Sequence, residues 1–311
     1  MKLILCGKNT AGAEALEFAA ERGDDVWAIG TAGDDGADGW QRSFKAAAIR
    51  LGVQFDQPPR INAREFVARL AAFEADALVS IQYDQILKRR LFESIGCPCL
   101  NLHFALLPRH RGVSPIAWAL ADGDPEAGVS LHHMIVEIDA GDVVSQRSVP
   151  IGPAETAREL YDKLSALAVE MFRESHPFPP ELVSRRLPQD GGKSSYHRAG
   201  DFDFSRREID WSRSAAELRC WIQAMIFPPM QYPTTRLGGR SFAVARVSGK
   251  VGDAAGAAPG VVLARSGEGI EVAASGGWIE ILELIDPASP ERPAAEIIGS
   301  VEVGDRFEAG G

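Results

Sequence analysis

Residues 2–173 alternate short apolar, β-prone runs with stretches whose apolar residues recur at helical spacing. The expected strands cover residues 2–6, 25–30, 53–55, 77–81, the run that ends with Asn101 and His103, 128–136 and 142–149. The expected helices cover residues 11–21, 40–51, 62–73, 87–94, 115–121 and 154–173, with Asn62 as the N-cap of the third. Alternation of this kind builds a mostly parallel sheet with helices on both faces. The sequence therefore predicts an α/β, Rossmann-like fold for this part of the chain.

The composition changes between residues 177 and 203, where prolines, glycines and serines replace the periodic apolar pattern. Beyond this stretch, a helix is expected at 215–225, followed by short β-prone runs at 234–237, 241–247, 260–264, 269–273 and 278–284. Short strands punctuated by glycine and proline are typical of a small barrel or sandwich. We therefore expect a catalytic domain at residues 1–186, a linker at 187–204 and a smaller β-rich, barrel-like domain at 205–311.

The charge balance restricts the partners of the chain. Its formal net charge is −10, and its largest basic clusters are Lys88-Arg89-Arg90 and Arg206-Arg207. A protein that holds polyanionic nucleic acid normally carries a larger basic stripe, so nucleic acid is not expected as a partner. No apolar stretch approaches the roughly 20 residues of a membrane span, so no membrane partner is expected.

Four cysteines, Cys6, Cys97, Cys99 and Cys220, lie in apolar sequence contexts. One residue separates Cys97 from Cys99, whereas paired zinc ligands normally have two or more residues between them. The sequence therefore predicts buried, reduced thiols and no metal site. Reduced thiols, together with an N-terminal apolar run too short for a signal peptide, predict a cytoplasmic location.

Asn101 and His103 stand at the end of a very apolar run that has the character of a strand. Side chains two residues apart in a strand share a face, and open α/β sheets bind ligands at the carboxyl ends of their strands. An amide there can donate to a developing oxyanion, and an imidazole can act as a base near neutral pH. Asp139 could complete the set by orienting the imidazole. The alternative is a polar strand end whose Asn101 caps the next turn and whose His103 is satisfied locally.

Residues 99–144 carry further motifs around these three residues. In chain order they are Leu106-Leu107-Pro108, Arg111-Gly112 with Pro115, Gly128-Val129-Ser130, and Asp139 with Gly141-Asp142. Together with Asn101-x-His103, the set resembles the signature of the 10-formyltetrahydrofolate-dependent formyltransferases, which include methionyl-tRNA formyltransferase, the glycinamide ribonucleotide transformylases and the sugar N-formyltransferases. Ala105 departs from the pattern, since that family usually has serine before Leu-Leu-Pro. Residues 209–247 are similar to the C-terminal domain of the tRNA and amino-sugar formyltransferases.

The resemblance implies formyl transfer from 10-formyltetrahydrofolate to an amine, without a metal. Asn101 would donate its amide to the oxyanion, His103 would accept the proton of the amine, and Asp139 would hold the imidazole in one tautomer. The pterin of the folate would lie in an apolar slot between two loops, where backbone groups would recognise part of it. The residues expected to form this slot are Gln82, Tyr83, Gln85, Ile86, Leu87, Val136, Ile138 and Asp142.

Other polar residues near these motifs have competing interpretations. Arg111 is expected either to bind substrate or to bond backbone carbonyls in a structural role, and Tyr196 is a candidate substrate contact. His132 and His133 point to opposite faces of an expected strand, and we interpret them as satisfied in the core or at the surface. His110, between two arginines, is interpreted as a solvated loop residue.

Two features bear on the amine that accepts the formyl group. Methionyl-tRNA formyltransferases carry a basic insertion after the second strand, whereas residues 31–40 here contain Asp34, Asp35 and Asp38 and no lysine or arginine. Residues 82–87 also resemble the amino-sugar enzymes more than the tRNA enzyme. The predicted acceptor is therefore a primary amine of a small molecule, with a nucleotide-linked amino sugar placed first.

Several alternatives to this function stay open. The acceptor could be methionyl-tRNA or an N-hydroxyornithine-type precursor. The same residues could act on water in a formyl-folate hydrolase, or the chain could be a non-catalytic binding module. A homodimer is one possible assembly.

Overall fold

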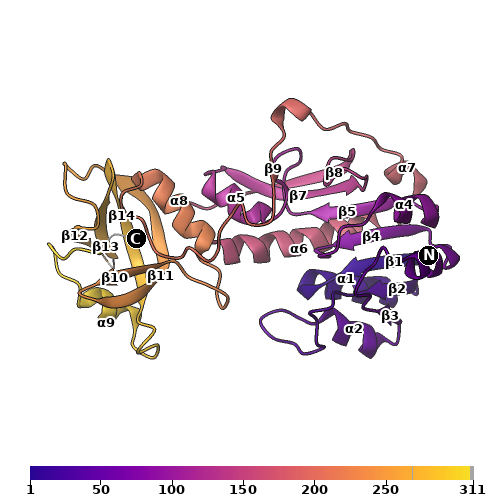
Figure 1. The fold of residues 1–311 in the computed structure, drawn as a ribbon, viewed down its shortest axis with the longest axis horizontal. Helices are drawn as coiled ribbons and strands as arrows, with labels where there is room; N and C mark the ends of the chain where they lie inside the picture. The colour runs from indigo at the N-terminus through magenta and orange to yellow at the C-terminus, as the bar shows by residue number, and fades with distance from the viewer. Residues whose placement is uncertain (268, 309–311) are drawn as a thin grey trace. The chain divides into compact units, whose positions relative to one another are not determined.

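The computed structural model describes residues 1–267 and 269–308, which form two compact units. The first unit comprises Met1–Pro115, Gly128–Val149 and Asp162–Arg198, and the second comprises Ile116–Ala127, Pro150–Tyr161 and Ala199–Gly311. Figure 1 labels the helices and strands along the chain. Each unit has a sheet and a hydrophobic core of its own.

A seven-stranded sheet, in the order β3-β2-β1-β4-β5-β7-β8, forms the centre of the first unit. Its strands are β1 (Lys2–Gly7), β2 (Asp25–Ile29), β3 (Gln54–Asp56), β4 (Ala77–Ile81), β5 (Cys99–His103), β7 (Glu126–His133) and β8 (Val143–Pro150). β1 pairs in parallel with β2 and β4, as do β2 with β3 and β4 with β5, whereas β7 runs antiparallel to β5. The mostly parallel sheet predicted from the sequence is confirmed.

Helices cover both faces of this sheet. Those of the first unit are α1 (Asn9–Glu21), α2 (Phe44–Leu51), α3 (Arg64–Ala72), α4 (Arg89–Ile95), α7 (Pro180–Val183) and, from Asp162 on, α6 (Ala157–Ser175), whereas α5 (Pro115–Ala121) belongs almost wholly to the second unit. Ile4 and Leu5 are adjacent on β1 and so point to opposite faces, and both are fully buried. Across residues 1–267 and 269–308, no helix combines the length and the apolar character that a membrane crossing needs.

Helix α2 begins at Phe44 rather than at the expected residue 40. Ser43 is its N-cap and accepts a hydrogen bond from the first turn. The hydroxyl of Ser43 donates to Asp34 Oδ1 at 2.6 Å, and its backbone N–H donates to Asp38 Oδ1 at 2.7 Å. Because Asp34 and Asp38 bond the polar groups of Ser43 itself, the helix begins only after this residue, and the preceding residues form a loop.

The expected capping role of Asn62 is wrong. Helix α3 begins at Arg64, and its N-cap is Ala63, which makes no side-chain cap. The amide of Asn62 instead donates to the carbonyl oxygen of Ile86 and accepts from the backbone N–H of Lys88, both at 2.8 Å. Asn62 therefore anchors the stretch of chain that follows β4.

The second unit contains a five-stranded sheet in the order β10-β11-β14-β13-β12, and all of its pairs are antiparallel. Its elements are α8 (Ala215–Met225), β10 (Thr234–Leu237), β11 (Arg240–Gly252), β12 (Val262–Ser266), β13 (Gly269–Ala274), β14 (Gly277–Ile285) and α9 (Ala294–Gly299). The predicted β-rich character is confirmed. Helix α9 was not expected, because its six residues are too few to show a helical period.

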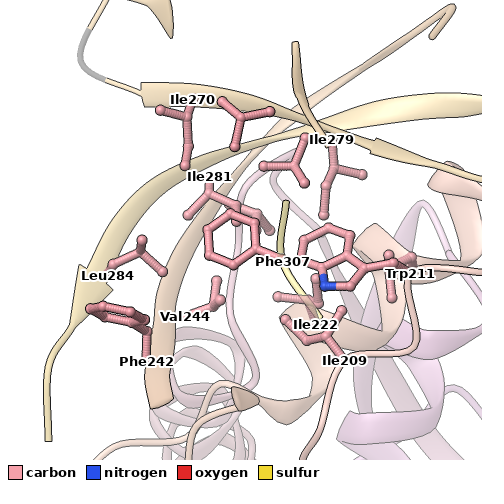
Figure 2. Close-up of a cluster of buried hydrophobic side chains, with 14 of the residues drawn as sticks. Ile209, Trp211, Ile222, Phe242, Val244, Ile270, Ile279, Ile281, Leu284 and Phe307 are labelled. Carbon is pink, nitrogen blue, oxygen red and sulfur yellow. The ribbon is translucent and has the colours of Figure 1, made fainter. Parts of the chain in front are cut away.

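Trp211 lies at the centre of the core of the second unit. Figure 2 shows its indole beside the ring of Phe307, and the two rings stack with centroids 5.7 Å apart. Both side chains are almost completely buried. The indole N–H donates to Thr235 Oγ1 at 3.1 Å, so the one polar group of this side chain is satisfied.

Replacement of Trp211 tests the importance of this packing. Trp211→Ala should lower the free energy of unfolding by about 3–5 kcal/mol, because it removes a large buried side chain and leaves a cavity. Thr235→Val is the matched control, since it removes the hydrogen-bond partner and keeps the volume, at a cost of about 1–3 kcal/mol. Urea denaturation followed by circular dichroism measures both. Equal losses for the two variants would contradict the packing argument.

Candidate active site

Asn101 and His103 lie on one face of the sheet, two residues apart on β5. Strand β7 brings further polar residues to that face, because its register places His132 opposite Asn101 and Ser130 opposite His103. Directly opposed residues in an antiparallel pair have Cβ atoms about 4.5–5.5 Å apart. The pairing of β5 with β7 therefore gathers an amide, two imidazoles and a hydroxyl in one patch.

Asp139 reaches the same face from the loop between β7 and β8. Its Oδ2 lies 3.6 Å from Nδ1 of His103, and its Oδ1 lies 3.5 Å from Nε2 of His132. The backbone N–H of Gly112 donates to Oδ2 at 2.8 Å and fixes the carboxylate. A Cβ at Gly141 would stand 1.9 Å from a carbonyl oxygen of β7, so this loop can close over the face only with glycine there. The Asp-x-Gly motif thus has a steric cause.

Both ring nitrogens of His103 have fixed neighbours in this buried site. Nε2 lies 2.8 Å from the carbonyl oxygen of His110, and because a carbonyl can only accept, Nε2 carries the proton of the neutral ring. Nδ1 is then unprotonated and faces Asp139 across a gap longer than a hydrogen bond. Burial lowers the pKa of His103 below its ordinary value near 6.5, and the charge of Asp139 opposes part of that shift. The ring is therefore neutral at pH 7 and can take a proton at Nδ1.

The Asp139 carboxylate is ionised. Burial by itself would raise the pKa of Asp139, but attraction to the His103 and His132 rings in their protonated forms, together with the N–H of Gly112, outweighs burial and holds the pKa well below its usual range. Asp139 therefore supplies a permanent negative charge between two imidazoles. No group of three or more His, Cys, Asp or Glu side chains, within the part of the chain that the structure describes, is placed to hold a metal ion.

His132 is satisfied in the core, one of the two places interpreted from the sequence, and its ring also lies beside Asn101 and Asp139. It is buried, with Nδ1 2.9 Å from the carbonyl oxygen of His133 and Nε2 3.2 Å from Nδ2 of Asn101. Nδ1 therefore carries the proton, and Nε2 accepts a hydrogen bond from the Asn101 amide. The sequence contains a signal for this placement of His132. Ser130 of the Gly-Val-Ser motif and His132 are two residues apart in a strand and so share one of its faces.

His110 is buried, so its interpretation as a solvated loop residue is wrong. Its ring stacks on that of His197 with centroids 5.4 Å apart, and its Nδ1 lies 3.2 Å from His197 Nε2. Its backbone N–H donates to Ser195 Oγ at 2.8 Å. The next residues form the short strand β6 (Arg111–Gly112), which pairs in parallel with β9 (Tyr196–His197). Residues 195–197 therefore pack on the segment that touches His103 and Asp139.

Arg111 and Tyr196, the expected substrate contacts, occupy these two short strands. The guanidinium of Arg111 donates to Oε1 of Gln189 through Nε at 2.9 Å and Nη2 at 2.7 Å. This contact is structural, although it goes to a side-chain amide and not to backbone carbonyls as expected. The side chain of Tyr196 is 48% exposed and so accessible to a ligand. Substrate binding by both residues stays a prediction.

The residues expected to line the folate slot differ in their exposure. Ile86 and Val136 expose 59% and 42% of their surface, so each offers apolar area to a ligand, and Ile138 is half-buried. Leu87 is buried in the core beside β4. The hydroxyl of Tyr83 is buried and has no hydrogen-bond partner among the described residues. Burial raises the pKa of this phenol, which is therefore neutral and able to donate.

The polar members of the expected slot hold the two loops in place. The amide of Gln85 accepts from the backbone N–H of Ile61 and donates to the carbonyl oxygen of Pro58, both at 2.8 Å. Gln82 accepts a bond from the Asn9 amide, and Asp142 lies 3.9 Å from a guanidinium nitrogen of Arg186. These contacts make the side chains of Gln82 and Gln85 loop anchors. Their contact with folate stays a prediction.

A cavity of about 370 Å³ opens at the carboxyl ends of β1, β2 and β4. Its lining includes Lys8, Asn9, Asp34, Asp35, Trp40 and Asp84. Gly7 of β1 pairs with Ile81, which pairs with Leu102 of β5. Lys8 follows Gly7 in the chain, and His103 follows Leu102. Lys8 and His103 are therefore separated by two strand spacings, or about 10 Å. The cavity thus opens at the same edge of the sheet as His103, although the lining contains none of Asn101, His103 and Asp139.

Comparison with known proteins places the chain in a family. Residues 34–175 match the family model described as formyl transferase, and residues 204–301 match that of the formyl transferase C-terminal domain. The methionyl-tRNA formyltransferase of Aromatoleum aromaticum is 33% identical over 99% of this chain and 98% of its own. That of Myxococcus xanthus is 36% identical over 77% of this chain and 75% of its own. The chain therefore belongs to the formyl transferase family.

Solved structures share the fold of this chain. One is WlaRD, a sugar 3N-formyl transferase in the presence of dTDP and 5-N-formyl-THF, with a TM-score of 0.70 and 22% identity over 90% of this chain and 96% of its own. Another is the N-formyltransferase of Helicobacter canadensis with folinic acid and dTDP-3-aminofucose, with a TM-score of 0.70 and 21% identity over 90% of this chain and 98% of its own. At 22% and 21% sequence identity, the similarity of this chain to the two structures establishes a shared fold alone.

The contact between His132 and Asn101 leads to a prediction about turnover. His132→Leu removes the acceptor that orients the Asn101 amide and should lower kcat at least about tenfold, because a misplaced donor stabilises an oxyanion poorly. His132→Gln offers an oxygen acceptor near the position of Nε2 and should recover part of the loss. Steady-state kinetics measure both, with His133→Leu as the neighbouring control. Equal turnover in the leucine and glutamine variants would rule out the orienting contact.

The pKa of His103 predicts the acid side of the pH profile. The neutral ring is the form that accepts a proton, so kcat/KM should fall as the pH drops through the pKa of His103, below its ordinary value near 6.5. Asp139 raises this pKa, so Asp139→Asn should move the acid limb to lower pH as well as lowering turnover. A movement of the limb to higher pH would contradict the assigned contact.

Proposed function

We propose that this formyltransferase transfers the formyl group of 10-formyltetrahydrofolate to an amine, with Asn101, His103 and Asp139 as catalytic residues. The proposal depends on one observation, the convergence of an oriented amide, a neutral buried imidazole and an ionised carboxylate on the β5–β7 face. The two solved sugar formyltransferases contain folate derivatives, which supports a folate donor. The loops at residues 82–87 and 136–142 would hold the pterin, with Ile86 and Val136 supplying exposed apolar surface.

The chemistry follows from the protonation states of the site. The free amine attacks the formyl carbon, and the carbonyl oxygen becomes an oxyanion that the Asn101 amide stabilises by donating a hydrogen bond. The proton of the amine passes to Nδ1 of His103, where the Asp139 carboxylate stabilises the imidazolium. The bond from the formyl carbon to the folate nitrogen then breaks, and that nitrogen receives the proton. The products are the formamide and tetrahydrofolate.

Methionyl-tRNA is the acceptor that the relatives favour. Chains that carry this name match almost the whole length of this one at about 30% identity. The relatives thus favour the alternative acceptor over the nucleotide-linked amino sugar that sequence analysis placed first. We therefore propose methionyl-tRNA as the first acceptor to be tested.

A small-molecule amine is the second candidate, because the electrostatics of the chain oppose a large polyanion. Residues 205–311 contain eleven Lys and Arg against fourteen Asp and Glu. Asp34, Asp35 and Asp84 line the cavity near His103, and Arg42 in the same lining is paired with Glu17. These charges repel a phosphate backbone but accept a cationic amine or the hydroxyl groups of a sugar.

A panel of acceptors decides between the two candidates. The enzyme is mixed with 10-formyltetrahydrofolate and either methionyl-tRNA or a dTDP-linked amino sugar, and mass spectrometry detects the gain of one formyl group. Formylation of methionyl-tRNA, with a rate that falls steeply with salt, supports the first candidate. Formylation of the sugar alone supports the second. Asn101→Ala and His103→Ala should each lower turnover at least about a hundredfold while the fold is retained.

Two other outcomes would overturn the proposed function. Release of formate without an added amine would indicate a hydrolase that uses the same residues on water. Binding of folate without turnover of any acceptor would indicate a non-catalytic module. Near-normal activity of Asn101→Ala would place the chemistry at other residues.

A further inference from the structure

The connector after helix α7 contains one side chain that turns inward. Within residues 184–194, all of which the structure describes, Gln189 is the one side chain that is not exposed. This stretch lies outside both matched family ranges, 34–175 and 204–301. A two-way backbone bridge between Leu187 and Val143 fixes the connector to β8 just before Gln189. A half-buried carboxamide is not expected in a segment that only joins two domains, so Gln189 indicates a further role for this connector.

Gln189 uses both ends of its carboxamide. Nε2 donates to the carbonyl oxygen of Asp139 at 2.8 Å and to that of Gly141 at 2.6 Å. Oε1 accepts from Nε and Nη2 of Arg111 at 2.9 and 2.7 Å. A carboxamide can donate two bonds and accept two, so these four contacts match its capacity.

These contacts join the two segments that place the catalytic groups. The carbonyls of Asp139 and Gly141 belong to the loop that carries the carboxylate. Arg111 lies between His110, whose carbonyl accepts from His103, and Gly112, whose N–H donates to the Asp139 carboxylate. Gln189 therefore ties the carboxylate loop to the segment that orients the imidazole.

The loop that carries Asp139 needs such a tie. The φ of Asp139 is +53°, in the left-handed region that residues other than glycine seldom occupy. The bond from Gln189 to the backbone carbonyl of Asp139 acts on this disfavoured conformation directly. Without it, the loop can relax towards an ordinary conformation and carry the carboxylate away from the two imidazoles.

We propose that Gln189 is a positioning residue, which holds the Asp139 carboxylate against His103 from a connector outside both family domains. The inference rests on the proposed catalytic role of Asp139. A displacement of about 1 Å at a catalytic group can lower turnover about a hundredfold, so loss of this tie should reduce kcat strongly.

Three single variants test the proposal with 10-formyltetrahydrofolate and the acceptor, methionyl-tRNA or the dTDP-linked amino sugar, that the panel identifies. Gln189→Met keeps the length of the side chain without its polar groups and should lower kcat about 10- to 100-fold, with the KM values and the melting temperature nearly unchanged. Gln189→Glu keeps an acceptor for Arg111 but cannot donate to the loop, and it should also lose kcat. Lys193→Met, at a 79% exposed side chain in the same connector, is the control and should behave as the wild type.

A double-mutant cycle separates positioning from general stabilisation. If Gln189 acts through Asp139, Gln189→Met should lower kcat less than about threefold in an Asp139→Asn background. Equal losses in both backgrounds, wild-type kcat in Gln189→Met, or wild-type kcat in Gln189→Glu would each overturn the inference. Near-normal turnover of Asp139→Asn alone would instead overturn the proposed function, so the two failures are distinguishable.

Discussion

Backbone hydrogen bonds between β5 and β7 set Asn101 opposite His132 and His103 opposite Ser130, and the other contacts of the site depend on this register. A slip of one residue would turn every side chain of one strand to the opposite face. The register is fixed over four residue pairs, and Leu100, Leu102 and Leu131 are buried among them. Packing of these apolar side chains therefore also determines the geometry of the polar ones.

A buried carboxylate is costly unless charges and donors compensate it. The donor that compensates Asp139 is the backbone N–H of Gly112 on β6, whereas His103 on β5 and His132 on β7 face the carboxylate through unprotonated ring nitrogens. Either ring gains a favourable partner in the carboxylate once it takes up a proton. The Asp139 carboxylate would therefore stabilise the imidazolium that forms during a proton transfer.

Sequence reasoning succeeded where the relevant signal was local. The strand at 77–81 and the helices at 115–121 and 215–225 were predicted to the residue, because each is bounded by clear breaks in a periodic pattern. The motifs also singled out Asn101, His103 and Asp139, which the structure brings together. His110 was misjudged because its burial depends on long-range packing, and the contacts of His132 with Asn101 and Asp139 were not predicted because they depend on strand register. Gln189 gave no signal at all, since a lone glutamine in a proline- and glycine-rich stretch has no period or motif.

The first compact unit extends to Arg198, well past its last long helix. Residues 187–198 belong to it through Leu187, Gln189 and the short strand β9. A chimera that replaces the C-terminal part of this chain with that of a relative therefore keeps residues 187–198 with the first unit only if its junction lies beyond residue 198. A crossover inside the stretch that resembles a linker would replace part of the first unit with foreign sequence.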